Sequence, residues 1–215
     1  MKYKIFAGTC LVLVGLFAAT SLYYKKEQAE MYDFMVQNNA TTFVRDYSQT
    51  LGADDAKVFL VEFMDPACET CAAFSPFIKQ IMAANPGKIK LVLRYAPFHN
   101  GADYFVKILE AAKKQGKYWE TLDIMFKSQP YWASHHHPQP QKIWQFLPKA
   151  GLDLEQIKKD MNDPAFLKII EQDLEDAKTL NVRKTPGFFV NGRPLETFGS
   201  EQLYQLIQSE IDAKY

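Results

Sequence analysis

The sequence contains few of the residues that define small cross-linked or repetitive proteins. Its 215 residues include three cysteines, ten glycines and eleven prolines. Three cysteines cannot supply the disulfide framework of a small secreted domain or the four thiolates of a structural zinc site. Glycine and proline at these levels exclude a collagen-like or low-complexity chain. With 47% hydrophobic and 23% charged residues, the composition is that of an ordinary globular protein.

The sequence also lacks an excess of charge of either sign. Its 25 lysines and arginines balance 25 aspartates and glutamates. Proteins that bind nucleic acids attract phosphates through clustered basic residues. We therefore expect no nucleic-acid partner. The length allows one domain with additional segments.

The amino terminus carries the longest uncharged stretch of the chain. Residues 5–24 contain no charged side chain, and as a helix they would span about 30 Å, the thickness of the lipid hydrocarbon core. Three interpretations stay open: an uncleaved anchor, a cleaved signal peptide, and a buried helix of a soluble protein. The small residues at 18–21 end in Thr or Ser, a poor cleavage site, which favours a membrane anchor at residues 1–24.

The anchor interpretation has consequences for the rest of the chain. Residues 25–41 are expected to form a stalk, and residues 42–215 a folded domain. Both the anchor and the signal interpretation carry this domain across a membrane, into a compartment that favours disulfides. We expect it to face the periplasm or the cell exterior, tethered if the anchor is retained and soluble if a signal is cleaved.

Two compact apolar runs predict buried strands in an α/β domain. Residues 58–64 and residues 89–95 are rich in valine, leucine and isoleucine. The segment between them, residues 68–84, places its apolar side chains at helical spacing and is followed by Asn-Pro-Gly. Strand, helix and strand in this order predict two parallel strands joined by a right-handed crossover.

The remaining sequence adds a strand and a group of helices. Residues 41–47 are predicted to form a short edge strand. From about residue 100 to residue 182 the pattern is mainly helical. Within it, Asp153 and Asp163 are candidate helix caps, the second followed by proline at the first helical position.

The last part of the chain predicts a hairpin and a helix. Asn191 and Gly192 are the preferred pair for a tight two-residue turn, and they separate the short segments 187–190 and 193–195. A terminal helix is expected to begin at Ser200, which would cap it.

Cys68 and Cys71 form a C-x-x-C sequence between the first predicted strand and its helix. The start of a helix presents unpaired N–H groups and a partial positive charge, which lower the pKa of a thiol there. This placement predicts Cys68 as an exposed nucleophile and Cys71 as the resolving thiol. A static disulfide, two ordinary core cysteines and a metal site are the alternatives. Glu69 is expected to raise the pKa of its neighbour Cys68 and so to oppose strong oxidising power.

Two motifs in this order resemble the thioredoxin superfamily. Val61-Glu62-Phe63 precedes the cysteine pair, and Thr185-Pro186-Gly187-Phe188-Phe189-Val190-Asn191-Gly192 lies near the carboxyl end. The helical segment between them resembles the insertion of DsbA-type thiol–disulfide oxidoreductases. The resemblance covers about residues 42–213. It implies a thioredoxin fold, a βαβ unit plus an antiparallel ββα unit, with an all-helical insertion at about residues 100–182.

The resemblance also implies roles for three residues outside the cysteine pair. Pro186 is implied to follow a cis peptide bond and to face the cysteines, and Thr185 to offer backbone groups to a bound substrate strand. Glu62 is implied to be a buried acid that accepts a proton from Cys71. The alternatives are a trans turn proline at 186 and a solvated glutamate at 62.

The resulting prediction is thiol–disulfide exchange on reduced or misfolded exported proteins, with the chain acting as a disulfide-forming oxidase. No organic cofactor or metal is expected, and the family implies a membrane redox partner that resets the cysteine pair. A reductase or isomerase is one alternative. The other is a copper- or zinc-handling protein that uses Cys68, Cys71 and the histidines His135, His136 and His137.

Overall fold

The computed structural model describes residues 13–23, 26, 40–133 and 137–215. The chain divides into two compact units, Met1–Ala40 and Thr41–Tyr215. In the first unit, residues 13–23 are helical. Within the described ranges, no helix combines the length and the apolar character needed to cross a bilayer. The predicted anchor and stalk lie largely outside these ranges and stay predictions.

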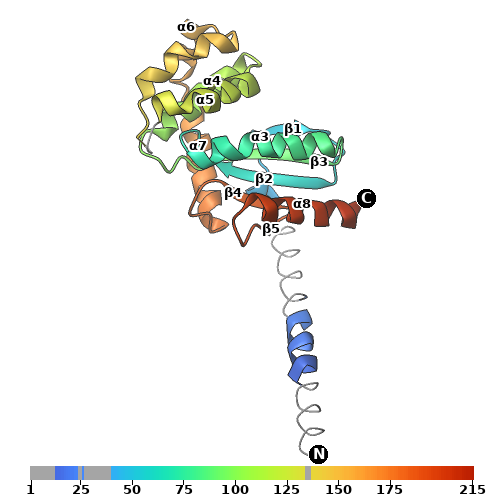
Figure 1. The fold of residues 1–215 in the computed structure, drawn as a ribbon. Coiled ribbons are helices and arrows are strands. Elements are labelled where there is room, and N and C mark those ends of the chain that lie inside the picture. Colours follow the sequence, from blue (N-terminus) through green and yellow to red (C-terminus); the bar gives the residue numbers. More distant parts are fainter. Residues whose placement is uncertain (1–12, 24–25, 27–39, 134–136) are drawn as a thin grey trace, which may run out of the picture. The chain divides into compact units, whose positions relative to one another are not determined.

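The second unit is built on a five-stranded mixed sheet in the order β1-β3-β2-β4-β5 (Figure 1). The central strands β2 and β3 are parallel, and every other neighbouring pair is antiparallel. Strands buried on both faces need apolar residues throughout, which explains why the two most apolar runs lie at the centre. The strands are β1 (Gln49–Gly52), β2 (Val58–Met64), β3 (Ile89–Tyr95), β4 (Gly187–Val190) and β5 (Arg193–Pro194).

Helices cover both faces of this sheet. The crossover helix α3 (Glu69–Ala84) contacts α8 (Ser200–Lys214), which packs on β2 and β4, whereas α7 (Pro164–Thr179) packs on β3. Successive side chains of β3 point to opposite faces, so Leu93 lines a cavity beside α3 while Arg94 contacts α7. The predicted βαβ unit and the antiparallel ββα unit are confirmed.

A helical insertion lies between β3 and α7. Its core includes the rings of Phe105 and Trp132, both fully buried with centroids 4.2 Å apart. Asp153 and Asp163 act as N-terminal caps, as predicted, by accepting hydrogen bonds from the backbone N–H groups of Gln156 and Ala165. The insertion comprises α4 (Ala102–Lys114), α5 (Tyr118–Trp132), the 3₁₀ helices η2 (Pro140–Gln145) and η3 (Leu147–Ala150), and α6 (Leu154–Asp160).

The predicted turn at the carboxyl end is confirmed, and the predicted helix start needs one correction. Asn191 and Gly192 have positive φ angles of 47° and 82°, as a type I′ hairpin turn requires. The cap of α8 is Gly199, so Ser200 is the first residue inside the helix and does not cap it.

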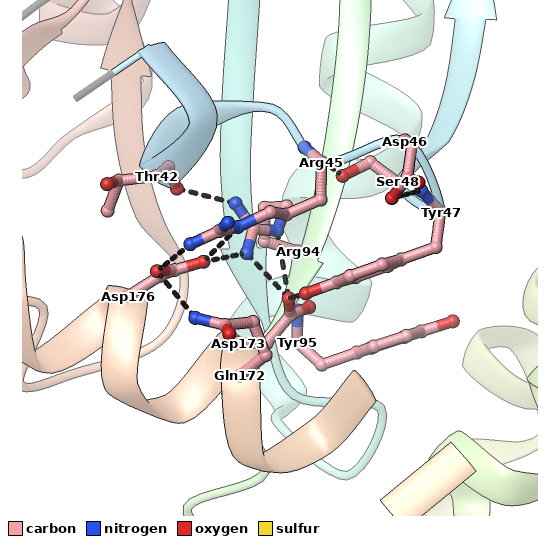
Figure 2. Close-up of polar contacts among 10 residues, drawn as sticks. All are labelled: Thr42, Arg45, Asp46, Tyr47, Ser48, Arg94, Tyr95, Gln172, Asp173 and Asp176. Carbon is pink, nitrogen blue, oxygen red and sulfur yellow. Dashed lines mark hydrogen bonds and ion pairs between the residues drawn. The ribbon is translucent and has the colours of Figure 1, made fainter. Parts of the chain in front are cut away.

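The predicted edge strand at residues 41–47 is wrong. Ala40–Phe43 is a short helix, α2, and the edge strand β1 starts only at Gln49. Figure 2 shows the reason: the side chains of Arg45 and Tyr47 reach α7, where they bind Asp176 and Asp173 at 2.7 Å. These distant ion pairs and hydrogen bonds outweigh the local preference of the Thr-Thr-Phe-Val run for an extended conformation.

Arg94 is the centre of this polar group and is fully buried. Its guanidinium binds Asp173 at 2.6 Å and Asp176 at 2.5 Å, and it donates to the carbonyl of Thr42 at 2.5 Å. We call Arg45, Tyr47, Arg94, Asp173 and Asp176 the Arg94 cluster. It joins β3, α7 and the segment before β1 (Figure 2).

Candidate active site

The two cysteines lie where β2 passes into α3. The connecting residues 65–68, the redox turn, begin with a fully buried Asp65. Its carboxylate accepts a hydrogen bond from the N–H of Ala67 at 2.8 Å, and its carbonyl accepts one from the N–H of Cys68 at 3.0 Å. An aspartate that binds the backbone two residues later, followed by proline, forms a turn from local sequence alone. The turn delivers Cys68 to the N-cap of α3 and Cys71 to its first turn.

Both cysteines are thiols, and neither is broadly exposed. Cys71 is fully buried, and Cys68 is 5% exposed. The placement of the pair at the helix start is as predicted, but Cys68 is more covered than the prediction of an exposed thiol. The covering residues include Thr185, whose carbonyl oxygen lies 3.3 Å from Cys68 Sγ.

The surroundings of Cys68 stabilise its thiolate. A hydrogen bond from the Cys71 thiol has the largest effect, and the Thr185 side chain and the backbone N–H groups of Cys71 and Thr70 add to it. Together they outweigh burial and lower the pKa of Cys68 from 9.0 to about 5. The net change is downward, so the expected upward influence of Glu69 does not decide this pKa.

Cys71 has the opposite character. Burial raises the pKa of its thiol well above the ordinary value, and its hydrogen bond to Cys68 and the nearby Glu62 raise it further. A protonated Cys71 is the form that donates to a Cys68 thiolate. The pair therefore combines one readily ionised sulfur with one that holds its proton.

Glu62 is buried in the middle of β2. It is 4% exposed and lies between Leu93 of β3 and Phe188 of β4 in the sheet register. Burial, together with the negative charge of Cys68, raises the pKa of Glu62 from 4.5 to about 8. A cavity of about 10 Å³ borders Glu62, Ser75 and Trp119. The implied proton transfer with Cys71 stays a prediction.

Near the carboxyl end, Thr185 meets Cys68, and the implied facing of Pro186 toward the cysteines stays a prediction. The bond between Thr185 and Pro186 is cis. Thr185 contacts Cys68 through its carbonyl and its side chain. The binding of a substrate strand by Thr185 and Pro186 stays a prediction.

Three further residues, none of them predicted from the sequence, hold the redox turn. Asp65 Oδ2 lies 2.8 Å from the backbone nitrogen and 2.7 Å from Nδ1 of His99. The third is Gln129 of α5, whose Nε2 donates to the carbonyls of Pro66 and Cys68. Asp65 could have been found from the sequence, because an aspartate followed by proline favours a turn and lies three residues before Cys68. No local pattern in the sequence marks His99 and Gln129, because they reach the turn from distant parts of the chain.

Part of the proposed metal site, in the histidine loop, lies outside the described residues. His135 and His136 lie outside them, so the histidine loop stays a prediction. Among the described residues, no group of three or more Cys, His, Asp and Glu side chains is arranged to hold a metal ion. Cys68 is instead hydrogen-bonded to the Cys71 thiol and to Thr185.

A low-pKa thiolate beside a protonated thiol is an arrangement suited to thiol–disulfide exchange. The thiolate is the nucleophile in such exchange, and a thiol of low pKa is also the better leaving group. A buried carboxyl with a pKa near neutrality can exchange protons with the second thiol.

Comparison with known proteins agrees with this geometry. A family model described as "Thioredoxin" matches residues 45–209. The chain is 31% identical over 144 residues, or 67% of its length, to a Na(+)/H(+) antiporter NhaA of Herminiimonas arsenicoxydans, and it spans only 22% of that protein. It is 28% identical over 199 residues to the "Probable disulfide bond formation protein D" of Bacillus cereus, covering 87% of this chain and 86% of that one.

A solved structure extends the likeness to three dimensions. The thiol-disulfide exchange protein alpha-DsbA2 from Wolbachia pipientis superposes with a TM-score of 0.69 at 18% identity. The match covers 88% of this chain and 98% of that one. At this identity the likeness shows the shared fold.

Proposed function

Because the chain belongs to the thioredoxin family, whose family model spans most of the folded unit, we propose that this thiol–disulfide oxidoreductase forms disulfide bonds in exported proteins. The observation that carries the proposal is the stabilised Cys68 thiolate, with a pKa of about 5. Whatever stabilises the reduced pair makes the oxidised pair a stronger oxidant. The similarity to a protein named for disulfide bond formation supports the same direction.

The proposed reaction starts from the Cys68–Cys71 disulfide. A substrate thiolate attacks Cys68 Sγ, the bond between the two cysteines breaks, and the electron pair leaves with Cys71. Burial raises the pKa of Glu62 above its ordinary value, so Glu62 can hold a proton and give it to the Cys71 sulfur. A second substrate thiolate then attacks the substrate sulfur of the mixed disulfide and releases Cys68 as a thiolate. Two electrons pass from two substrate thiols to the cysteine pair.

Thr185 and Pro186 are proposed to position the substrate. The Thr185 carbonyl lies beside Cys68 Sγ, so a chain joined to Cys68 would pass next to it. An extended substrate segment can pair with backbone groups of such a loop while its own sulfur is held by Cys68. The substrates are proposed to be reduced or misfolded exported proteins.

The proposal includes a location and a partner. Residues 1–24 hold the chain in a membrane, residues 25–41 form a stalk, and residues 42–215 are the catalytic domain on the outer side. A membrane redox partner accepts the two electrons and restores the disulfide. Terminal sequencing of the mature protein tests the anchor: a chain that begins within residues 21–30 would show a cleaved signal instead.

The direction of electron flow is tested with the purified full-length chain in glutathione buffers. An oxidase should have a reduction potential near the roughly −120 mV of DsbA, and a reductase one near the roughly −270 mV of thioredoxin. The oxidised protein should also introduce disulfides into a reduced, unfolded ribonuclease. A thioredoxin-like potential together with failure in the ribonuclease assay would overturn the oxidase proposal in favour of the reductase or isomerase.

A further inference from the structure

One side chain of the helical insertion reaches the redox turn and binds it twice. Gln129 lies in the last turns of α5 and is 3% exposed. Its Nε2 atom donates to the carbonyl of Pro66 at 3.0 Å and to the carbonyl of Cys68 at 3.1 Å. No step of the proposed reaction uses this residue.

The chemistry of the contact matches an amide donor. Both partners are carbonyl oxygens, which only accept hydrogen bonds, and an amide nitrogen carries two hydrogens, one for each. The Cys68 carbonyl also accepts from the backbone N–H of Ala72 at 3.2 Å, as part of the start of α3. Gln129 therefore holds two backbone carbonyls of the redox turn, that of Pro66 and that of Cys68 itself.

The redox turn is held from two sides. On one side Asp65 binds the backbone of Ala67 and His99, and on the other side Gln129 binds the two carbonyls. The contacts that stabilise the Cys68 thiolate, from Thr185 and from the N–H groups at the start of α3, require that the Cys68 backbone stays where these two sides place it.

We propose that Gln129 is a positioning residue for thiol–disulfide exchange, which fixes the Cys68 backbone so that Sγ stays against Thr185 and the first N–H groups of α3. The inference rests on the proposed function, since it concerns the same cysteine. It gives the helical insertion a role in the chemistry. Through this amide, the packing of α5 sets the reactivity of a sulfur on the thioredoxin unit.

The test replaces Gln129 in the full-length chain. Gln129→Met keeps the length of the side chain and removes both donors, and Gln129→Glu keeps its shape and removes at least one. Ser128→Ala is the matched control, because Ser128 is an equally buried neighbour whose hydroxyl binds within α5 and not to the redox turn. For each reduced protein, iodoacetamide labelling of Cys68 is followed against pH by mass spectrometry, and the melting temperature is recorded.

Both Gln129 variants are expected to raise the pKa of Cys68 by about one unit, the size that one lost hydrogen bond can produce. Labelling at pH 5 should fall several-fold, while Ser128→Ala keeps the wild-type profile. If both Gln129 variants lower the melting temperature but label like the wild type, Gln129 supports the fold only and the proposal is wrong. If Ser128→Ala shifts the profile equally, the effect belongs to α5 as a whole and the proposal is also wrong.

The labelling experiment separates this inference from the proposed function. The ionisation of Cys68 is measured on the reduced protein without a substrate. A reductase-like potential would therefore overturn the oxidase proposal and leave the role of Gln129 standing. A wild-type labelling profile in both Gln129 variants would overturn the role of Gln129 and leave the oxidase proposal standing.

Discussion

Cys68 and Cys71 lie three positions apart at the start of one helix, yet the pKa of Cys68 is lower and that of Cys71 higher than in an ordinary cysteine. Burial has the largest effect on Cys71 and raises its pKa, and the hydrogen bond that Cys71 donates to the Cys68 sulfur raises it further while it lowers the pKa of Cys68. Burial favours the neutral form of both thiols, and only Cys68 has enough donors around it to overcome burial. The nucleophile is thus defined by its neighbours.

This account predicts a difference between two replacements of Cys71. Cys71→Ser keeps a hydroxyl donor for the Cys68 thiolate, whereas Cys71→Ala removes the donor with the largest effect. The pKa of Cys68 should therefore be higher in Cys71→Ala than in Cys71→Ser, by about one unit. Labelling of Cys68 against pH measures it. Equal pKa values in the two variants would show that Thr185 and the helix start stabilise the thiolate without a donor at position 71.

Glu62 leads to a prediction about pH and stability. Its pKa is about 8 in the folded protein and ordinarily 4.5, so between these values the folded state holds a proton that the unfolded state has lost. The stabilisation is complete below pH 4.5 and is lost as the pH rises through 8. Relative to Glu62→Gln, the wild type should lose about 1.4 kcal/mol of unfolding free energy for each pH unit in this window.

The measurement is urea unfolding of the oxidised proteins between pH 5 and pH 8. The oxidised form is used because Cys68 does not titrate when it is in a disulfide. Burial, the larger cause, still raises the pKa of Glu62 in that form, but the charge of Cys68 no longer adds to it, so the window closes below pH 8. Parallel stability profiles for the wild type and Glu62→Gln would mean that Glu62 ionises at its ordinary pH and is unsuited to proton exchange with Cys71.

At the scale of elements, the Arg94 cluster ties α7 to the sheet. Burial alone would raise the pKa of Asp176, but hydrogen bonds and charge from Arg45 and Arg94 lower it, so this carboxylate stays ionised inside the protein. Two arginines face two aspartates, and Tyr47 closes the group from the segment before β1 (Figure 2). A balanced, fully bonded group of this kind specifies which face of β3 receives α7.

Removing the central arginine should strongly destabilise the fold. Arg94→Met leaves Asp173 buried without its main partner, and breaking a buried pair in this way costs about 3–5 kcal/mol. Lys90→Met is the control on the same strand: its partner Asp54 is almost fully exposed, and such surface pairs contribute about 0–1 kcal/mol. Urea unfolding compares the two. A loss for Arg94→Met no larger than for Lys90→Met would show that the Arg94 cluster does not hold α7 in place.

At the scale of the whole molecule, the redox state of the pair should govern stability. In the reduced protein Cys68 has a pKa of about 5 against an ordinary 9.0, so the unfolded state binds more protons between these values. The stabilisation from the thiolate is present in full above pH 9 and is lost as the pH falls through 5. Glu62 titrates in both redox states, and the part of its raised pKa that comes from burial cancels in the difference between them.

The reduced protein should therefore gain stability relative to the oxidised protein as the pH rises from 5 to 9, by up to about 1.4 kcal/mol per pH unit. Thermal or urea unfolding of both forms across this range measures the difference. A difference that stays constant with pH would contradict a stabilised Cys68 thiolate and, with it, the main support for the oxidase direction.

Features that depend on neighbours in the chain were determined by the sequence alone. The order strand, helix, strand, the cysteine pair at the helix start, the Asn191-Gly192 turn and the cap at Asp163 all follow from contacts within a few residues. Such contacts form wherever the segment lies in the fold, because backbone conformation and local hydrogen bonds suffice to define them.

Only the tertiary structure decided which distant side chains meet. Thr185 reaches Cys68 from 117 residues away, Gln129 from 61, and Asp173 reaches Arg94 from 79. The same long contacts made residues 41–47 bind α7 instead of pairing as a strand. A contact of this kind depends on how every intervening element packs, and no local pattern records it. The sequence therefore located the reactive sulfurs, and the packing of β4, α5 and the sheet around them determined how each one ionises.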